Sequence, residues 1–327
     1  MNIDETQKEM NTIHETTTRC KKAISLLTFL LMLCLKSNAQ FDPMFTQYMN
    51  NEMFINPAYT GTRDVLAATL LYRNQWAGLE GAPKTQTFCI HSPLGDYSGA
   101  GLSFMNENIG ITNIIRANAN YSYRIQTSDL SHLSFGIDGG IINYRQSMQD
   151  LILVNQNDHL FTPNQQNVFA PNAGFGLFFY KKNFYLGLST PRMIKNSFRP
   201  NSSSKVQNSA SPKDWHYYLT SSIIIDVSDD FKFKPSIMMK EVAGAPIQGE
   251  ISLQGLVRDF WWFGTSYRSG DALSVILGMQ MTPQLRLFYS YDYSFTPLQS
   301  YNAGTHEITI GYDFTFKKKR ITSPRLF

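Results

Sequence analysis

Hydrophobic and polar residues alternate along most of this chain. The clearest example is the segment 305–316, whose sequence is THEITIGYDFTF. Every second residue from Ile308 to Phe316 is apolar, and the residues between them are small or polar. Because successive side chains of a strand point to opposite faces, this segment predicts a β-strand with one apolar face and one polar face. Such strands build either a soluble sandwich, which buries the apolar face, or an outer-membrane barrel, which turns that face toward lipid.

About fourteen segments of strand character follow one another from residue 65 onward, and none shows a sustained helical period. The segments 115–124, 247–257 and 285–294 alternate most regularly. The pattern therefore predicts an all-β fold and argues against an α/β fold. The expected strands are 65–76, 84–92, 98–106, 112–125, 130–144, 170–180, 183–190, 215–227, 231–240, 247–257, 260–268, 272–281, 285–294 and 305–316.

The links between the expected strands favour the barrel. Alternate links are short, as at 181–182 and 258–259, whereas the links 145–169 and 191–214 are long. Outer-membrane barrels have short periplasmic turns and long outer loops, and with an even strand number both termini are periplasmic. We therefore predict a transmembrane antiparallel β-barrel of the outer-membrane type over 65–316, with an even number of strands, about fourteen.

Aromatic residues gather near the ends of the expected strands. Such clusters suit the girdles that barrels place at the two membrane interfaces, although an ordinary aromatic core would also explain them. The clusters are Tyr121 with Tyr123, Phe179 with Tyr180, Tyr217 with Tyr218, Trp261 with Trp262, and Tyr291 with Tyr293.

The amino terminus has the plan of a signal peptide. Lys21 and Lys22 precede the apolar run 23–35, and the small-x-small sequence 37–39 follows it. We predict a cleaved signal peptide over 1–39 and hence export. The alternatives are an uncleaved anchor, for which the run is short, and a lipoprotein modified at Cys34. Cleavage leaves only Cys89, which excludes an intrachain disulfide and a zinc site built on cysteines.

Two further segments flank the expected barrel. Residues 40–64 have no steady period but carry several aromatic residues that require burial, so we predict an ordered periplasmic lead-in segment. Residues 317–327 begin with a basic run and form a predicted periplasmic tail. This tail either binds an acidic partner surface or lipid headgroups, or is simply a solvated end. The formal net charge of +4 is too small to indicate a nucleic-acid partner.

The sequence offers no catalytic or metal-binding constellation. It contains no G-x-S-x-G, H-E-x-x-H or P-loop motif, and no histidine lies at a metal-ligand spacing. We therefore expect no enzyme activity and no cofactor. Charged residues on the polar face of the expected strands either pair across the lumen and stiffen the barrel, or line a path for a solute. These lumen candidates are Arg116, Arg124, Asp138, Glu250, Arg286, Asp292 and Asp313.

The lead-in and the first hairpin resemble the PorP/SprF family. The resemblance rests on DPMFTQYMNNEMFINPAYTGTRD at 42–64, on LYRNQWAGLEGAPKTQTFCIHSPLG at 71–95, and on the closing SPRLF at 323–327. Thr60 stands where the family pattern would have Ala, and 50–52 is more polar than is usual. The residues matching the motif, which we treat as candidates for partner binding, are Asp42, Pro43, Gln47, Tyr48, Asn56, Pro57, Tyr59, Gly61, Arg63, Arg73, Gln75, Trp76, Pro83 and Thr85.

The resemblance implies an outer-membrane component of the type IX secretion and gliding machinery of Bacteroidota-type cells. Members of this family help to secrete large adhesins that carry a carboxyl-terminal sorting domain, or to retain them at the surface. The implied partners are such an adhesin, the periplasmic and outer-membrane secretion components, and outer-membrane lipid. From the residues themselves, Arg73 either pins the lead-in or binds a partner carboxylate. A channel or small-solute transporter, in which the lead-in could plug the lumen, is the alternative function.

Overall fold

A computed structural model describes residues 43–147, 166–197, 207–242 and 245–314. The predicted signal peptide, Asp42, the basic tail and parts of both long links lie outside these residues. The strands are β1 (Leu66–Asn74), β2 (Lys84–Pro93), β3 (Ser98–Ile109), β4 (Thr112–Ser128), β5 (Ser131–Gln146), β6 (Gln166–Lys181), β7 (Phe184–Arg192), β8 (Lys195–Ser197), β9 (Gln207–Ser209), β10 (His216–Ile223), β11 (Ile225–Ser228), β12 (Phe231–Val242), β13 (Gln248–Val257), β14 (Trp261–Arg268), β15 (Ala272–Gln280), β16 (Leu285–Ser294) and β17 (Thr305–Phe314).

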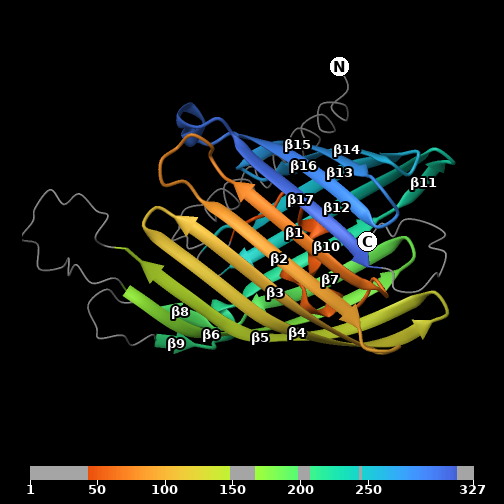
Figure 1. The fold of residues 1–327 in the computed structure, drawn as a ribbon, viewed down its shortest axis with the longest axis horizontal. Helices are drawn as coiled ribbons and strands as arrows, with labels where there is room; N and C mark the ends of the chain where they lie inside the picture. Colours follow the sequence, from red (N-terminus) through yellow and green to blue (C-terminus); the bar gives the residue numbers. More distant parts are fainter. Residues whose placement is uncertain (1–42, 148–165, 198–206, 243–244, 315–327) are drawn as a thin grey trace, which may run out of the picture. The chain divides into compact units, whose positions relative to one another are not determined.

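Fifteen of these strands form one antiparallel sheet, in which most strands pair with their neighbours in sequence, β7 pairs with β10, and β1 pairs with β17 (Figure 1). The sheet closes because β10 also pairs with β12. Since β10 and β11 are successive segments separated only by Ile224, the described residues form a closed barrel of fourteen strands. Closure removes the free sheet edges that an open sheet would expose to lipid.

The two faces of the barrel wall have opposite polarity. On the outer face Leu70, Ile137 and Val275 are 48%, 57% and 53% exposed. On the inner face Ser290, Glu307 and Thr309 are each 0% exposed. A soluble protein would bury the first set and expose the second, so the outer solvent is hydrocarbon. The fold is therefore an outer-membrane barrel, as predicted.

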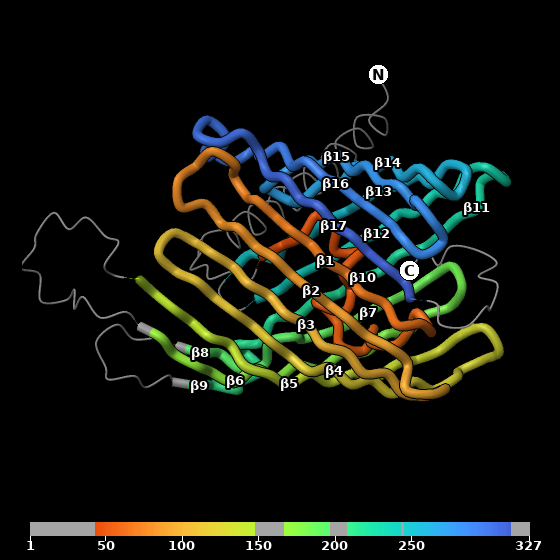
Figure 2. The backbone as a smooth tube through the Cα atoms, viewed as in Figure 1, coloured from red at the N-terminus to blue at the C-terminus, as the bar shows by residue number. Residues whose placement is uncertain are grey.

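The connections follow the predicted asymmetry. Leu66 pairs with Phe314, so the barrel begins and ends at the same rim, which we call the short-turn rim. The turns after β6, β11 and β13 lie at this rim, whereas the links after β5 and β7 lie at the opposite rim, the long-loop rim. Figure 2 follows these connections along the backbone tube.

Three details differ from the sequence prediction. β6 begins at Gln166 rather than at 170, which shortens the link that we expected over 145–169. The link 191–214 contains a two-stranded sheet of β8 and β9 and a 3-10 helix, η4 (Pro212–Asp214). Trp262 and Tyr218 face the lumen, where Trp262 packs with Phe288 and Tyr218 packs with Tyr48, so neither is part of an aromatic girdle.

The lead-in lies inside the barrel. It forms the helices η1 (Tyr48–Asn50), α2 (Glu52–Ile55) and η2 (Pro57–Tyr59), and it hydrogen-bonds to inward-facing side chains of the strands. The prediction of a periplasmic segment is corrected for residues 43–64, because they pack against and hydrogen-bond to the inner face of the barrel wall. We call residues 43–64 the plug. A further 3-10 helix, η5 (Pro297–Tyr301), lies between β16 and β17. Among the described helices, none combines the length and the apolar character that crossing a membrane requires.

Candidate functional site: a charged lumen that holds an internal plug

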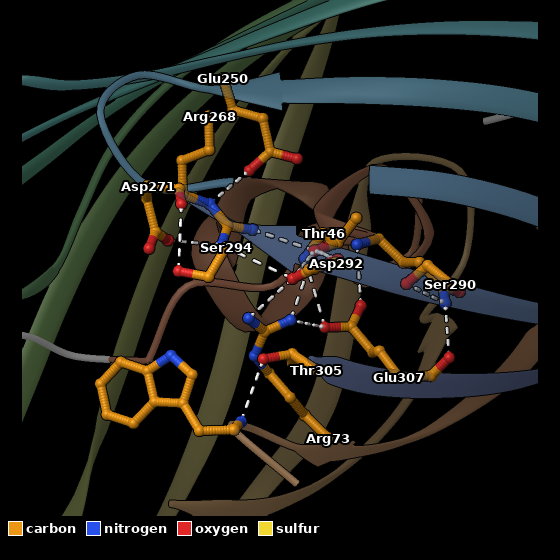
Figure 3. A network of polar contacts seen from close by, with 12 residues as sticks. Thr46, Arg73, Glu250, Arg268, Asp271, Ser290, Asp292, Ser294, Thr305 and Glu307 are labelled. Atoms are coloured by element: carbon orange, nitrogen blue, oxygen red, sulfur yellow. Dashed lines mark hydrogen bonds and ion pairs between the residues drawn. The ribbon is translucent and has the colours of Figure 1, made fainter. Parts of the chain in front are cut away.

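A buried charge cluster anchors the beginning of the plug (Figure 3). Register creates the cluster, because Arg73 of β1 lies opposite Glu307 of β17, and Glu250 of β13 lies opposite Arg268 of β14. The members, which we call the Arg73 cluster, are Arg73, Glu250, Arg268, Asp271, Asp292 and Glu307. Four carboxylates thus face two guanidinium groups, which leaves an excess of hydrogen-bond acceptors for the plug to satisfy.

Arg73 bridges two of these carboxylates. Its Nη2 lies 2.9 Å from Oδ2 of Asp292, and its Nη1 lies 2.8 Å from Oε2 of Glu307. Arg268 in turn lies 2.9 Å from Glu250 through Nε, and 3.7 Å from Asp292 through Nη1. Arg73 and Arg268 are 3% and 2% exposed, so these pairs are desolvated and depend on mutual geometry.

The plug contributes the missing donors. The Thr46 hydroxyl donates to Asp292 at 2.7 Å and accepts from Arg268 Nη2 at 3.0 Å. The backbone N–H groups of Thr46 and Gln47 donate to the two oxygens of Glu307 at 3.2 and 2.8 Å. The Gln47 amide also donates to the Glu307 carbonyl oxygen at 3.0 Å. Thr46 and Gln47 of the plug therefore satisfy acceptor oxygens of Asp292 and Glu307, which couples the plug to the charge cluster.

A second ion pair anchors the end of the plug near the short-turn rim. Arg63 forks onto Asp313 of β17, with Nε to Oδ1 at 3.1 Å and Nη2 to Oδ2 at 2.7 Å. Arg286 of β16 lies 3.7 Å from the same carboxylate. Beside them, Arg124 Nη1 lies 2.6 Å from Asp64, but the Asp64 side chain is 54% exposed. The Arg63 fork is thus the stronger anchor, because water screens the Arg124 pair.

Neutral hydrogen bonds hold the middle of the plug. Asn56 caps η2 by accepting from Ala58 N–H at 3.0 Å, and its amide donates to the Leu177 carbonyl at 2.9 Å. Gly61 N–H donates to His91 Nδ1 at 2.9 Å, which places any neutral His91 proton on Nε2. Ser122 donates to the Thr60 carbonyl at 2.6 Å. His91 and Ser122 are inward-facing side chains of β2 and β4, and Leu177 contributes a backbone carbonyl of β6.

Inward-facing glycines make room for this contact. A Cβ at Gly136 of β5 would lie 2.1 Å from the backbone nitrogen of Ala58, and one at Gly176 of β6 would lie 2.0 Å from Asn56 Oδ1. Since real Cβ atoms do not approach backbone or a capping side chain so closely, any larger residue would displace η2. The barrel wall is therefore shaped around the plug.

The other sequence candidates lie in three places. Tyr48, Tyr59 and Pro57 belong to the buried body of the plug, and Pro43 lines a small cavity beside it. Gln75, Trp76 and Pro83 belong to the β1–β2 link, in which Gln75 N–H donates to Pro83 O at 2.9 Å. Thr85 donates to Glu107 at 3.2 Å. The candidates from the family motif therefore lie in the plug, among its anchors, or near the long-loop rim.

The remaining lumen candidates also face inward. Arg116 stacks over the Phe54 ring of the plug, 5.7 Å from its centroid. Asp138 accepts from the amides of Asn118 and Asn172 at 3.0 and 3.3 Å. Arg268 and Glu307 were not among the lumen candidates, although the alternation in 305–316 places Glu307 on the polar face. The missing information was register, which decides which charges become neighbours.

Comparison with known protein families gives a match over most of the chain. The family described as type IX secretion system membrane protein PorP/SprF matches residues 37–312. The chain belongs to this family. No curated protein matches. The family and the barrel fold place this PorP/SprF chain in the outer membrane and make it a secretion component; the cleaved signal peptide stays a prediction.

Solved structures similar to this PorP/SprF chain are barrels of low identity. The CymD monoaromatic hydrocarbon channel is 10% identical with a TM-score of 0.48, over 81% of this chain and 93% of that one. A Pseudomonas aeruginosa FadL homologue is 14% identical with a TM-score of 0.45, over 80% and 93%. The KdgM porin is 10% identical with a TM-score of 0.36, over 76% and 99%.

Proposed function

We propose that this chain is a non-enzymatic component of type IX secretion that assists the secretion or surface retention of large adhesins with a carboxyl-terminal sorting domain. The observation that supports this most is where the family motif lies. Gln47, Asn56 and Gly61 belong to the plug, and Arg63 and Arg73 anchor it. The inner face of the barrel thus holds an internal segment. A barrel filled in this way suits a component that presents a rigid surface to partners.

The proposed division of surfaces follows the two rims. The long-loop rim, including the links 147–165 and 193–215, meets the exported adhesin. The short-turn rim, with the basic tail 317–327, meets periplasmic secretion components and lipid headgroups. This assignment rests on the orientation that short turns indicate, namely that the short-turn rim is periplasmic.

Deleting the gene should abolish surface display of one adhesin and leave small-solute uptake unchanged. Complementation with the wild-type chain should restore display. A chain in which 198–206 is replaced by a Gly-Ser linker of equal length should assemble in the outer membrane but restore display poorly, because the outer link would contact the adhesin. Display is measured by antibody labelling of intact cells, and barrel assembly by heat-modifiable gel mobility. Undiminished display in the deletion strain would refute the proposal.

The channel alternative predicts a different electrical behaviour. Because the plug is held by buried ion pairs and by backbone hydrogen bonds, the purified wild-type barrel should be silent in a planar bilayer. Steady conductance, or uptake of small solutes into liposomes, would favour the transporter over the secretion component. The measurement needs no knowledge of the adhesin and therefore tests the plug separately from the partner.

A further inference from the structure

An apolar groove on the outer face of the barrel lies outside everything assigned above. It encloses about 440 Å³ near the long-loop rim, across β6, β7, β10 and β12. Its walls include Phe175, Leu188, Tyr217 and Met239, each about 40–49% exposed on the lipid-facing side. The groove therefore opens toward hydrocarbon rather than toward the lumen.

A β-bulge shapes the groove. The register of β7 and β10 shifts so that Thr190 and Pro191 together oppose the single residue Tyr217. Bulges of this kind bend a strand and redirect side chains. Thr190, which lines the groove, is consequently buried to 5% exposure within an otherwise lipid-facing wall.

Two polar atoms of the groove lack hydrogen-bond partners among the described residues. They are the Thr190 hydroxyl and the Trp215 indole Nε1, and both residues line the groove. The neighbouring Tyr217 hydroxyl is already satisfied, because it donates to Pro212 O at 3.0 Å. A buried polar group without a partner is costly and points to a ligand that completes it. The Trp215 indole N–H can only donate a hydrogen bond, and the Thr190 hydroxyl can also donate one. The expected ligand group is therefore a hydrogen-bond acceptor.

We propose that this groove binds an acyl chain of a membrane lipid, with the ester carbonyl accepting hydrogen bonds from Trp215 and Thr190. The apolar walls match the chain, and an ester carbonyl is an acceptor without a donor. Trp and Tyr are enriched where the headgroup region begins, which is the depth of lipid esters. Two charged residues, Lys240 and Glu241, line the groove. Lys240 is 1% exposed and its ammonium lies over the Tyr218 ring, whereas Glu241 is exposed, so a fatty-acid carboxylate in the groove would meet the like charge of Glu241.

The test compares two lipids that differ only at the acceptor. The delipidated full-length mature protein is titrated with dipalmitoyl phosphatidylethanolamine and with its dihexadecyl ether analogue, and native mass spectrometry counts bound lipid. The ester lipid should bind about tenfold more tightly than the ether, as expected for two hydrogen bonds to a carbonyl. Palmitate serves as the free-acid probe and should bind more weakly than the ester lipid.

Two substitutions assign the binding to these atoms. Trp215→Phe and Thr190→Val each remove a polar atom and keep the shape, so together they should abolish the preference for the ester. The matched control is Trp261→Phe, because Trp261 is an exposed aromatic residue of β14 outside the groove. This variant should keep the preference for the ester lipid. Equal binding of ester and ether by the wild type, stronger binding of palmitate, or an unchanged preference in the double variant would overturn the proposal. Heat-modifiable mobility verifies folding, and the Trp215→Phe single variant provides the test if the double variant does not fold.

Discussion

Replacing Arg73 by Met should release the plug and strongly destabilise the protein. Arg73 is 3% exposed and is the direct counter-charge of Asp292 and Glu307. Removing one partner of a buried ion pair leaves uncompensated charge and costs about 3–5 kcal/mol. Here Glu307 loses its guanidinium partner, and Asp292 keeps only the longer contact with Arg268 at 3.7 Å. We expect the midpoint of urea unfolding in detergent to be lower than for the wild type. We also expect the variant to conduct ions in a planar bilayer, where the wild type should not.

The controls for this prediction use the opposite end of the plug and the partners of Arg73. Asp64→Asn weakens the Arg124 pair at an exposed site and should change stability by less than about 1 kcal/mol. Asp64 has a φ of 53°, which Asn tolerates, so the backbone is not strained. Adding Asp292→Asn and Glu307→Gln to Arg73→Met removes the unpaired charges and should recover much of the loss. Equal effects of Arg73→Met and Asp64→Asn would contradict the role assigned to the Arg73 cluster.

The strands were predictable because their information is local. Alternation alone placed Ile308 and Ile310 on one face and Glu307 and Thr309 on the other, and the structure exposes the first two residues and buries the last two. Period-two patterning depends only on neighbouring residues, so a single sequence suffices. The small sheet of β8 and β9 was not predicted, because three-residue strands carry no periodic signal.

The plug was not predictable in the same way. Its helix α2 has four residues, too few for a helical period, and its contacts join residues far apart, such as Thr46 with Glu307. Likewise, the sequence places Glu250 and Arg268 in separate strands, and only the pairing of β13 with β14 makes them neighbours. The sequence indicated that the aromatic residues of the lead-in are buried. Burial against a second protein would have met this requirement as well as burial inside the barrel.

Gly136→Ala should displace η2 from its position against β5, whereas Gly139→Ala on the same strand should leave the position of η2 unchanged. The first Cβ would lie 2.1 Å from the Ala58 nitrogen, which is backbone and cannot rotate away. The second would point to the outer face, where no atom lies within 4 Å. Because the wall strands keep their own pairing, the Gly136→Ala barrel should still assemble but with a displaced plug. The expected readouts are conductance in a planar bilayer and protease cleavage within 43–64.

A third variant separates a displaced plug from a damaged wall. Deleting 43–64 in the Gly136→Ala background removes the segment that the new methyl group would strike. If the clash with η2 is the whole effect, this deletion should behave like the same deletion in the wild type, both in assembly and in conductance. A Gly136→Ala barrel that stays silent and protease-resistant would show that the plug tolerates a methyl group there. In that case the close fit between β5 and η2 would not be what holds the plug in place, and the ion pairs of Arg63 and Arg73, together with the hydrogen bonds of the plug to the wall, would have to hold it.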